Sequence, residues 1–221
     1  MKYNIIIAGI GGQGVVTCGS LISKAAIHAG LNVVMSEIHG LAQRGGSVSV
    51  EVRIGDVSGP IIPNGEGDLL IGLEYMEGVR NIPRMKTGSL VILSKEKLTP
   101  VSLSMRGGEY PDFNETLDEA AKKLKIYEID AELIAMEAGD KRTSNSVILG
   151  FLSSREETLF KDSDFLNAID SMFSGNAMLM NHRAFELGSL EKTRFSLRKL
   201  NESLIKYEEE EKKKLHSQKT L

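Results

Sequence analysis

The chain has 221 residues, of which 41% are hydrophobic and 26% charged, the composition of an ordinary globular protein with a core of its own. Its 27 basic and 30 acidic residues give a formal net charge of -3, which offers no electrostatic case for binding nucleic acid or an anionic membrane. Cys18 is the single cysteine, which excludes an internal disulfide and a cysteine-ligated iron–sulfur cluster. The N-terminal apolar run from Ile5 to Ala8 is too short for a secretion signal, so we expect a cytoplasmic protein.

The first part of the chain predicts a parallel α/β arrangement. Tyr3 to Ala8 is an apolar, β-branched run closed by Gly9, which indicates a buried strand. Apolar residues then recur at helical spacing from Val15 to Ala29, and Leu31 to Met35 is a second apolar strand. We expect these two strands to be parallel, which places the loops that follow them at the same edge of the sheet.

Further strands and helices follow in the middle of the chain. Alternating apolar residues from Ser47 to Ile54 predict a half-buried strand. Two more apolar strands are expected at Asp68 to Leu73 and Ser89 to Leu93, separated by a short helix that Pro83 ends. The next predictions are a long connection over residues 95–111, a helix from Asn114 to Leu124 with Asn114 as its cap, and a strand from Lys125 to Ile129.

After Asp130 the pattern is helical. Helices are predicted at Ala131 to Ala138, Ser144 to Leu152 and Asp164 to Phe173, with a longer helix from near Asn176 to beyond Tyr207 and a charged, solvated end at Glu208 to Lys214. The expected fold is therefore α/β, an open, mostly parallel, Rossmann-like sheet with helices on both faces. We assign this domain to residues 1–188 and a helical C-terminal extension with a charged tail to residues 189–221.

A glycine loop joins the first strand to the first helix. Gly9-Ile10-Gly11-Gly12-Gln13-Gly14 matches G-x-G-x-x-G, in which glycines let the backbone turn tightly and approach a ligand. The helix that follows presents free N–H groups and a partial positive charge to an anion. A dinucleotide site also needs an acidic residue about 20 residues later, which Glu37 can supply. Two interpretations stay open: an NAD-binding Rossmann domain, or glycines that only permit close packing of strand and helix.

Polar side chains are concentrated in the segment after the second strand, Ser36-Glu37-Ile38-His39-Gly40-Leu41-Ala42-Gln43-Arg44-Gly45-Gly46. Arg44 is suited either to bidentate contact with a carboxylate or phosphate, or to a local ion pair with Glu37. His39 is either a proton donor at a substrate or a locally bonded side chain. Gln13 either donates to a ligand or pins the glycine loop. Cys18 is interpreted as a packed thiol, and no metal ligands are expected because the histidines lack ligand spacing.

Two of these motifs together resemble a known family. Gly9 to Val16 with Met35 to Val48 is similar to the gamma-domain family of pyruvate and other 2-oxoacid:ferredoxin oxidoreductases. The form with His39 resembles the beta subunit of the indolepyruvate enzymes in that family. Weaker similarity follows at Asp68 to Glu74, Lys86 to Ile92 and Asn145 to Gly150, so that the resemblance covers most of residues 3–188.

The resemblance implies a subunit without a complete active site. In such enzymes a larger alpha subunit holds thiamine diphosphate and iron–sulfur clusters, coenzyme A takes the acyl group, and electrons pass to ferredoxin. For this chain it implies a part in the oxidative decarboxylation of indolepyruvate or another aryl pyruvate, with no cofactor bound by the chain alone. Two alternatives stay open: a free-standing NAD-dependent oxidoreductase, and a structural assembly subunit whose glycine loop binds nothing.

The resemblance and the polar segment together give a set of candidate site residues. The candidate catalytic residues are His39 and Arg44. The candidate cofactor-binding residues are Gly11, Gly12, Gln13, Gly14, Glu37, Gly45, Gly46 and Asn145. We expect the segment from Glu37 to Gly46 to meet the partner subunit near its thiamine.

Overall fold

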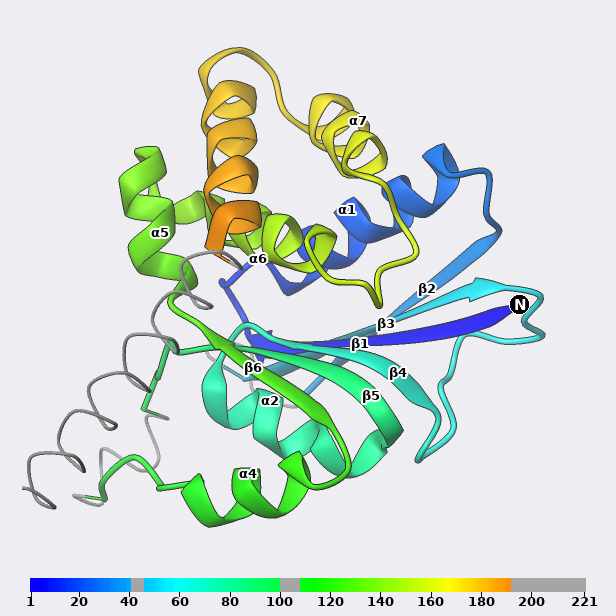
Figure 1. The fold of residues 1–221 in the computed structure, drawn as a ribbon, viewed down its shortest axis with the longest axis vertical. Helices are drawn as coiled ribbons and strands as arrows, with labels where there is room; N and C mark the ends of the chain where they lie inside the picture. Colours follow the sequence, from blue (N-terminus) through cyan, green and yellow to red (C-terminus); the bar gives the residue numbers. More distant parts are fainter. Residues whose placement is uncertain (41–45, 100–107, 192–221) are drawn as a thin grey trace, which may run out of the picture.

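The computed structural model describes residues 1–40, 46–99 and 108–191. The strands of these residues form one six-stranded sheet in the order β2-β3-β1-β4-β5-β6 (Figure 1). The strands are β1 (Lys2–Ile10), β2 (Val33–His39), β3 (Ser47–Gly55), β4 (Gly67–Gly72), β5 (Met85–Ser94) and β6 (Lys125–Ile129). The helices are α1 (Val15–His28), α2 (Tyr75–Asn81), η1 (Ile82–Arg84), α4 (Asn114–Ala121), α5 (Ala131–Ala138), η2 (Lys141–Thr143), α6 (Ser144–Ser153), α7 (Asp162–Met172) and a helix over residues 175–191.

The sheet is mostly parallel, as predicted, with one exception. Strands β1, β4, β5 and β6 pair in parallel, whereas β3 is antiparallel to both of its neighbours, β1 and β2. The connection between β2 and β3 is too short for a crossover, which needs roughly a dozen residues, so β3 must return alongside β2. As a result β2 runs in the same direction as β1, as expected, but lies at the edge of the sheet and does not touch β1.

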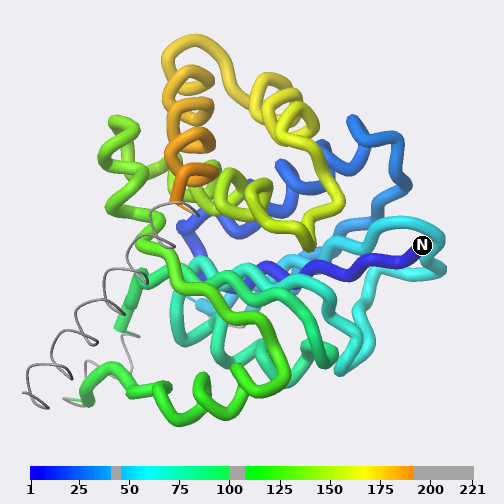
Figure 2. The backbone as a smooth tube through the Cα atoms, viewed as in Figure 1, coloured from blue at the N-terminus to red at the C-terminus, as the bar shows by residue number. Residues whose placement is uncertain are grey.

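Helices cover both faces of the sheet, which confirms the predicted layers (Figures 1 and 2). Helices α1, α5, α6, α7 and the helix over residues 175–191 lie on one face, and α2 and α4 lie on the other. Strand β1 contributes to both cores because its side chains alternate: Ile5 and Ile7 pack beneath α1, while Ile6 and Ala8 pack beneath α2. None of the helices in the described ranges is both long and apolar enough to cross a bilayer.

Several predicted boundaries differ from the structure; β5, for example, begins at Met85 and not at Ser89. Strand β2 extends to His39, because every residue from Val33 to His39 pairs with β3, so Glu37 and His39 are strand residues and not loop residues. Asn114 is the first residue of α4 and not its cap; Phe113 is the cap residue, and the Asn114 N–H donates to Asp112 at 2.9 Å. Helix α4 ends at Ala121 because the chain turns there into β6.

The predicted domain boundary at residue 188 falls within the helix over residues 175–191. The predicted continuation of this helix to Tyr207 and the charged end at Glu208 to Lys214 lie outside the described residues. The part of this helix that is described belongs to the core: an added Cβ at Gly188 would lie 2.0 Å from the carbonyl oxygen of Val147 in α6.

Candidate functional site

A pocket of about 560 Å³ lies at the carboxyl ends of β1, β4 and β5. Ligands of open α/β sheets commonly bind at this edge, since the loops after parallel strands converge there. The lining residues are Gly11, Gly12, Gln13, Gly14, Thr17, Leu73, Ser94, Glu96, Leu98, Glu132, Lys141, Arg142, Ser144, Asn145, Ile148 and Phe173. Five of the predicted site residues, Gly11 to Gly14 and Asn145, therefore share one pocket.

The glycine loop has a backbone shape that only glycine adopts easily. Gly12 has φ +104° and Gly14 has φ +74°, in the region that L-residues rarely occupy. Gly14 is also the residue that caps α1, so the start of this helix opens directly from the loop. The Gly11 N–H donates to the carbonyl oxygen of Gly46 at 3.0 Å. The end of the polar segment predicted to be functional is thereby held against the glycine loop.

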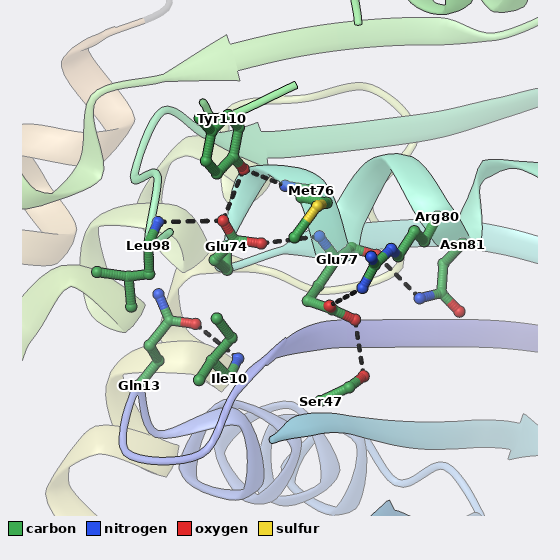
Figure 3. Close-up of polar contacts among 10 residues, drawn as sticks. All are labelled: Ile10, Gln13, Ser47, Glu74, Met76, Glu77, Arg80, Asn81, Leu98 and Tyr110. Atoms are coloured by element: carbon green, nitrogen blue, oxygen red, sulfur yellow. Dashed lines mark hydrogen bonds and ion pairs between the residues drawn. The ribbon is translucent and has the colours of Figure 1, made fainter. Parts of the chain in front are cut away.

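Gln13 holds the loop together from inside. Its Oε1 accepts the Ile10 N–H at 2.7 Å and its Nε2 donates to the Leu73 carbonyl oxygen at 3.3 Å (Figure 3). Burial raises the pKa of the nearby Glu96 carboxyl, and the Gln13 amide partly opposes that rise. Of the two interpretations of Gln13, these contacts correspond to pinning of the loop, because both ends of the amide are used within the protein.

Asn145 links the start of α6 to the glycine loop. Its Nδ2 donates to the Gly14 carbonyl oxygen at 3.0 Å, and its side chain is buried, with the residue only 7% exposed. Its Oδ1 is buried without a hydrogen-bond partner among the described residues. Unpaired buried acceptors are uncommon in native proteins, so this oxygen marks Asn145 as a residue to test.

The walls of the pocket carry charges of both signs. Lys141 and Arg142 of η2 are cationic, but each has an acidic neighbour: Lys141 lies 3.5 Å from Glu132, and Arg142 bonds Asp140 at 2.5 Å. Glu96 also lines the pocket, and burial, followed by the nearby Glu132 and Glu74 charges, raises the pKa of its carboxyl. The pocket thus contains a carboxyl group with a raised pKa together with the cations of Lys141 and Arg142.

Sequence reasoning did not single out Glu96, Lys141, Arg142 or Ser144 as pocket residues. Glu96 follows the predicted strand at Ser89 to Leu93, and the rule that ligands collect at the carboxyl ends of parallel strands would have found it. Lys141, Arg142 and Ser144 lie just before and at the start of α6, and no sequence pattern places that helix beside the glycine loop.

Glu37 and His39 do not line the pocket. They contact each other, with 3.2 Å between Glu37 Oε2 and His39 Nε2, and their side chains are 38% and 58% exposed. His39 is opposite Val48, which is opposite Gly9, so its backbone lies two strands, roughly 10 Å, from the glycine loop. Arg44 and Gly45 lie outside the described residues, and Gly46 adjoins Gly11.

The position of Glu37 argues against an NAD-type ribose contact. In a dinucleotide-binding fold the acidic residue follows a strand that lies next to β1 and parallel to it. Here antiparallel β3 occupies that place, and Glu37 is on the edge strand beyond it.

Cys18 lies in α1 and is fully buried, and burial raises the pKa of its thiol to about 12. A thiol that stays protonated in an apolar core is a packing group and not a nucleophile, in agreement with the interpretation from sequence. Among residues 1–40, 46–99 and 108–191 no group of three or more His, Cys, Asp or Glu side chains could hold a metal ion.

The fold and the pocket define a Rossmann-like α/β protein with a glycine loop at the carboxyl edge of its sheet. Residues 4–191 match the pyruvate ferredoxin/flavodoxin oxidoreductase family, and the chain belongs to that family. The family resemblance noted in the sequence is thereby confirmed.

Curated relatives belong to the indolepyruvate branch of this family. The indolepyruvate oxidoreductase subunit IorB of Methanothermobacter thermautotrophicus is 39% identical over 191 residues, covering 85% of this chain and 96% of the relative. The same subunit of Archaeoglobus fulgidus is 38% identical, covering 85% and 94%.

Two solved structures share the fold. One is the gamma subunit of the keto/oxoacid ferredoxin oxidoreductase of Geobacter sulfurreducens, with TM-score 0.63 and 22% identity over 85% of this chain and 94% of that one. The other is the 2-oxoglutarate:ferredoxin oxidoreductase of Magnetococcus marinus with 2-oxoglutarate, coenzyme A and succinyl-CoA bound, with TM-score 0.64 and 23% identity over 85% and 30%.

Proposed function

We propose that this chain is the small subunit of an indolepyruvate:ferredoxin oxidoreductase, in which aryl pyruvates are oxidatively decarboxylated to acyl-CoA. The observation that carries the proposal is 39% identity to a subunit IorB along nearly the full length of that relative. The partner is a larger alpha subunit that holds thiamine diphosphate and iron–sulfur clusters and passes electrons to ferredoxin. The complex acts in the cytoplasm.

The division of cofactors follows from the chemistry of this chain. Iron–sulfur clusters are held by cysteine thiolates, and the one cysteine here is buried with a raised pKa. The iron–sulfur clusters therefore belong to the partner, and we assign the thiamine to it by resemblance to the family. Coenzyme A, when bound, supplies the thiol that accepts the acyl group.

We propose that the glycine-loop pocket contributes to the coenzyme A site. Gly11 and Gly12 have no side chain to block close approach of a phosphate, and α1 starts directly after Gly14. Lys141, which also lines the pocket, adds a positive charge. These groups would bind and orient an anionic ligand.

We propose a second surface from the polar segment that includes Glu37, His39, Arg44, Gly45 and Gly46. Its support is the bond between Gly11 N–H and Gly46 O, together with the exposure of the Glu37 and His39 side chains. These groups would face the partner subunit and help to enclose the substrate near the thiamine. His39 and Arg44 would be the residues that contact the substrate.

The experiment is co-expression of this chain with a thiamine-dependent alpha subunit. The complex should reduce ferredoxin with indolepyruvate and coenzyme A, and the isolated chain should be colourless and inactive. Stoichiometric iron on the isolated chain, or oxidation of a 2-oxoacid by the isolated chain, would contradict the proposal. Binding of NAD(H) to the isolated chain would instead support a free-standing dehydrogenase.

One observation favours a second candidate, a structural assembly subunit. Gln13 and the Nδ2 of Asn145 both bond within the protein, as they would in a loop that binds nothing. If this candidate is correct, a side chain added at Gly11 should narrow the pocket and leave the KM for coenzyme A unchanged. Substitution of Gly11 therefore separates the two possibilities.

A further inference from the structure

Glu74 is a fully buried carboxylate at the start of α2, and both of its oxygens are bonded. Its Oε2 accepts the Glu77 N–H at 2.8 Å, which caps the helix. Its Oε1 accepts the Tyr110 hydroxyl at 2.6 Å and the Leu98 N–H at 3.2 Å (Figure 3). Helix capping needs only one side-chain oxygen, so the second oxygen does something else.

The second oxygen holds one wall of the pocket. Leu98 and Glu96 both line the pocket, and the Tyr75 N–H donates to the Glu96 carbonyl oxygen at 2.9 Å. The start of α2 therefore contacts the segment after β5 at two backbone positions. Gln13, which pins the glycine loop, donates its Nε2 to the carbonyl oxygen of Leu73 at 3.3 Å, and Leu73 directly precedes Glu74. Residues 73–75 therefore contact both this wall of the pocket and the glycine loop.

The same helical turn also holds the segment on the other side of the loop. The Glu77 carboxylate accepts the Ser47 hydroxyl at 2.7 Å, and Ser47 directly follows Gly46. Gly46 accepts the Gly11 N–H at 3.0 Å. The first turn of α2 is thus bonded to Ser47 on one side and to Leu98 on the other, as Figure 3 shows.

The energetics are unusual for a residue that serves stability alone. The three groups that donate to Glu74 are two backbone N–H groups and a tyrosine hydroxyl, all uncharged. Burying a carboxylate on uncharged donors carries a desolvation cost that an apolar or neutral residue avoids. The glutamate side chain is long enough to accept hydrogen bonds from all three donors at once. The position of its carboxylate therefore fixes the positions of the three donor groups.

Resting on the function proposed above, we propose that Glu74 is a positioning residue for the coenzyme A pocket: it sets the wall formed by Glu96 and Leu98 against the glycine loop without touching the ligand. Gln at this position has the same shape but replaces one acceptor oxygen with an amide that donates. At least one of the three donors then loses its partner, and the wall moves relative to Gly11 to Gly14.

The test uses the assembled complex with Glu74→Gln, and Glu51→Gln as the matched control. Glu51 is equally buried and accepts the Ile62 N–H at 2.6 Å and an ion pair from Arg84, but it does not line the pocket. For Glu74→Gln the KM for coenzyme A should rise about tenfold, equivalent to one hydrogen bond to a charged group, while the KM for the 2-oxoacid is unchanged. Glu51→Gln should lower stability and leave both KM values at wild type.

Tyr110→Phe covers the case in which Glu74→Gln fails to fold, because it removes only the hydroxyl bonded to Glu74 and Met76. It should raise the KM for coenzyme A by a smaller factor. Equal effects of Glu74→Gln and Glu51→Gln on both KM values would overturn the proposal, as would a wild-type KM in a folded Glu74→Gln complex.

Hydrogen exchange of the isolated chain separates this proposal from the function on which it rests. In Glu74→Gln, but not in Glu51→Gln, the amides of residues 10–14 and 96–98 should exchange faster. A wild-type complex that turns over no 2-oxoacid would refute the proposed function, whereas unchanged exchange at these amides would refute the role of Glu74.

Discussion

Asn145 donates its Nδ2 to the carbonyl oxygen of Gly14 at 3.0 Å across a separation of 131 residues. The same carbonyl oxygen accepts the Cys18 N–H at 2.9 Å within α1. The bond from Asn145 therefore joins α6 to the start of α1, and it orients the amide so that Oδ1 is the atom left without a partner among the described residues.

Substitution of Asn145 should lower stability in a defined order. Asn145→Ala removes one bond but leaves Gly14 O with the Cys18 N–H, so the free energy of unfolding should fall by about 1 kcal/mol. Asn145→Asp should cost more, because a carboxylate oxygen would then face the Gly14 carbonyl oxygen in a buried place. Urea unfolding of both variants measures this, and an Asp variant as stable as the wild type would contradict the contact.

Gly14→Ala should destabilise the chain more than Gly65→Ala. Both glycines have similar positive φ, +74° and +80°, so both variants carry the cost of a left-handed L-residue, about 1–2 kcal/mol. An added Cβ at Gly14 lies 2.8 Å from Asn145 Nδ2, whereas at Gly65 it meets nothing within 4 Å. The difference between the two free energies of unfolding isolates the contact with Asn145. Equal losses would show that Asn145 moves aside freely.

Gly11→Ala is the substitution that narrows the pocket without straining the loop. Gly11 has no positive φ, and an added Cβ would lie 3.8 Å from Gly46 O and 3.9 Å from Val48 Cγ2, both ordinary contacts. Stability should change by less than about 1 kcal/mol, while the KM for coenzyme A rises in the assembled complex. Gly12→Ala is less informative because its φ of +104° adds backbone strain. A wild-type KM in Gly11→Ala would assign the glycine loop to packing and favour the structural subunit.

Cys18 should make stability fall with pH in the alkaline range. Burial raises the pKa of its thiol from 9.0 to about 12, so between these values the unfolded chain has lost the proton that the folded chain keeps. The stabilising contribution is complete below the unfolded pKa and declines above it, by about 1.4 kcal/mol per pH unit.

Cys18→Ala is the control for the tyrosines that titrate in the same range. Its unfolding free energy should fall less than that of the wild type between about pH 8 and about pH 10, with a difference of about 1.4 kcal/mol. Identical pH profiles would mean that the thiol ionises in the folded protein.

Local patterns were sufficient for most of the elements and for the family. Continuous apolar runs predicted the buried strands, helical spacing predicted α1, and glycines between the two predicted a loop that only glycine can form. These properties depend on residues that are neighbours along the chain. The motifs from Gly9 to Val16 and Met35 to Val48 carried the family resemblance for the same reason.

Only the tertiary structure decided how the site is assembled. The hairpin return of β3 separates β2 from β1 and places Glu37 and His39 on the sheet edge, away from the pocket. Packing of α6 brings Asn145 to Gly14, and Glu74 gathers donors from Leu98 and Tyr110. Hydrophobic periodicity specifies which face of an element is buried but not its partner. Strand order and side-chain contacts between distant residues follow from packing of the whole chain.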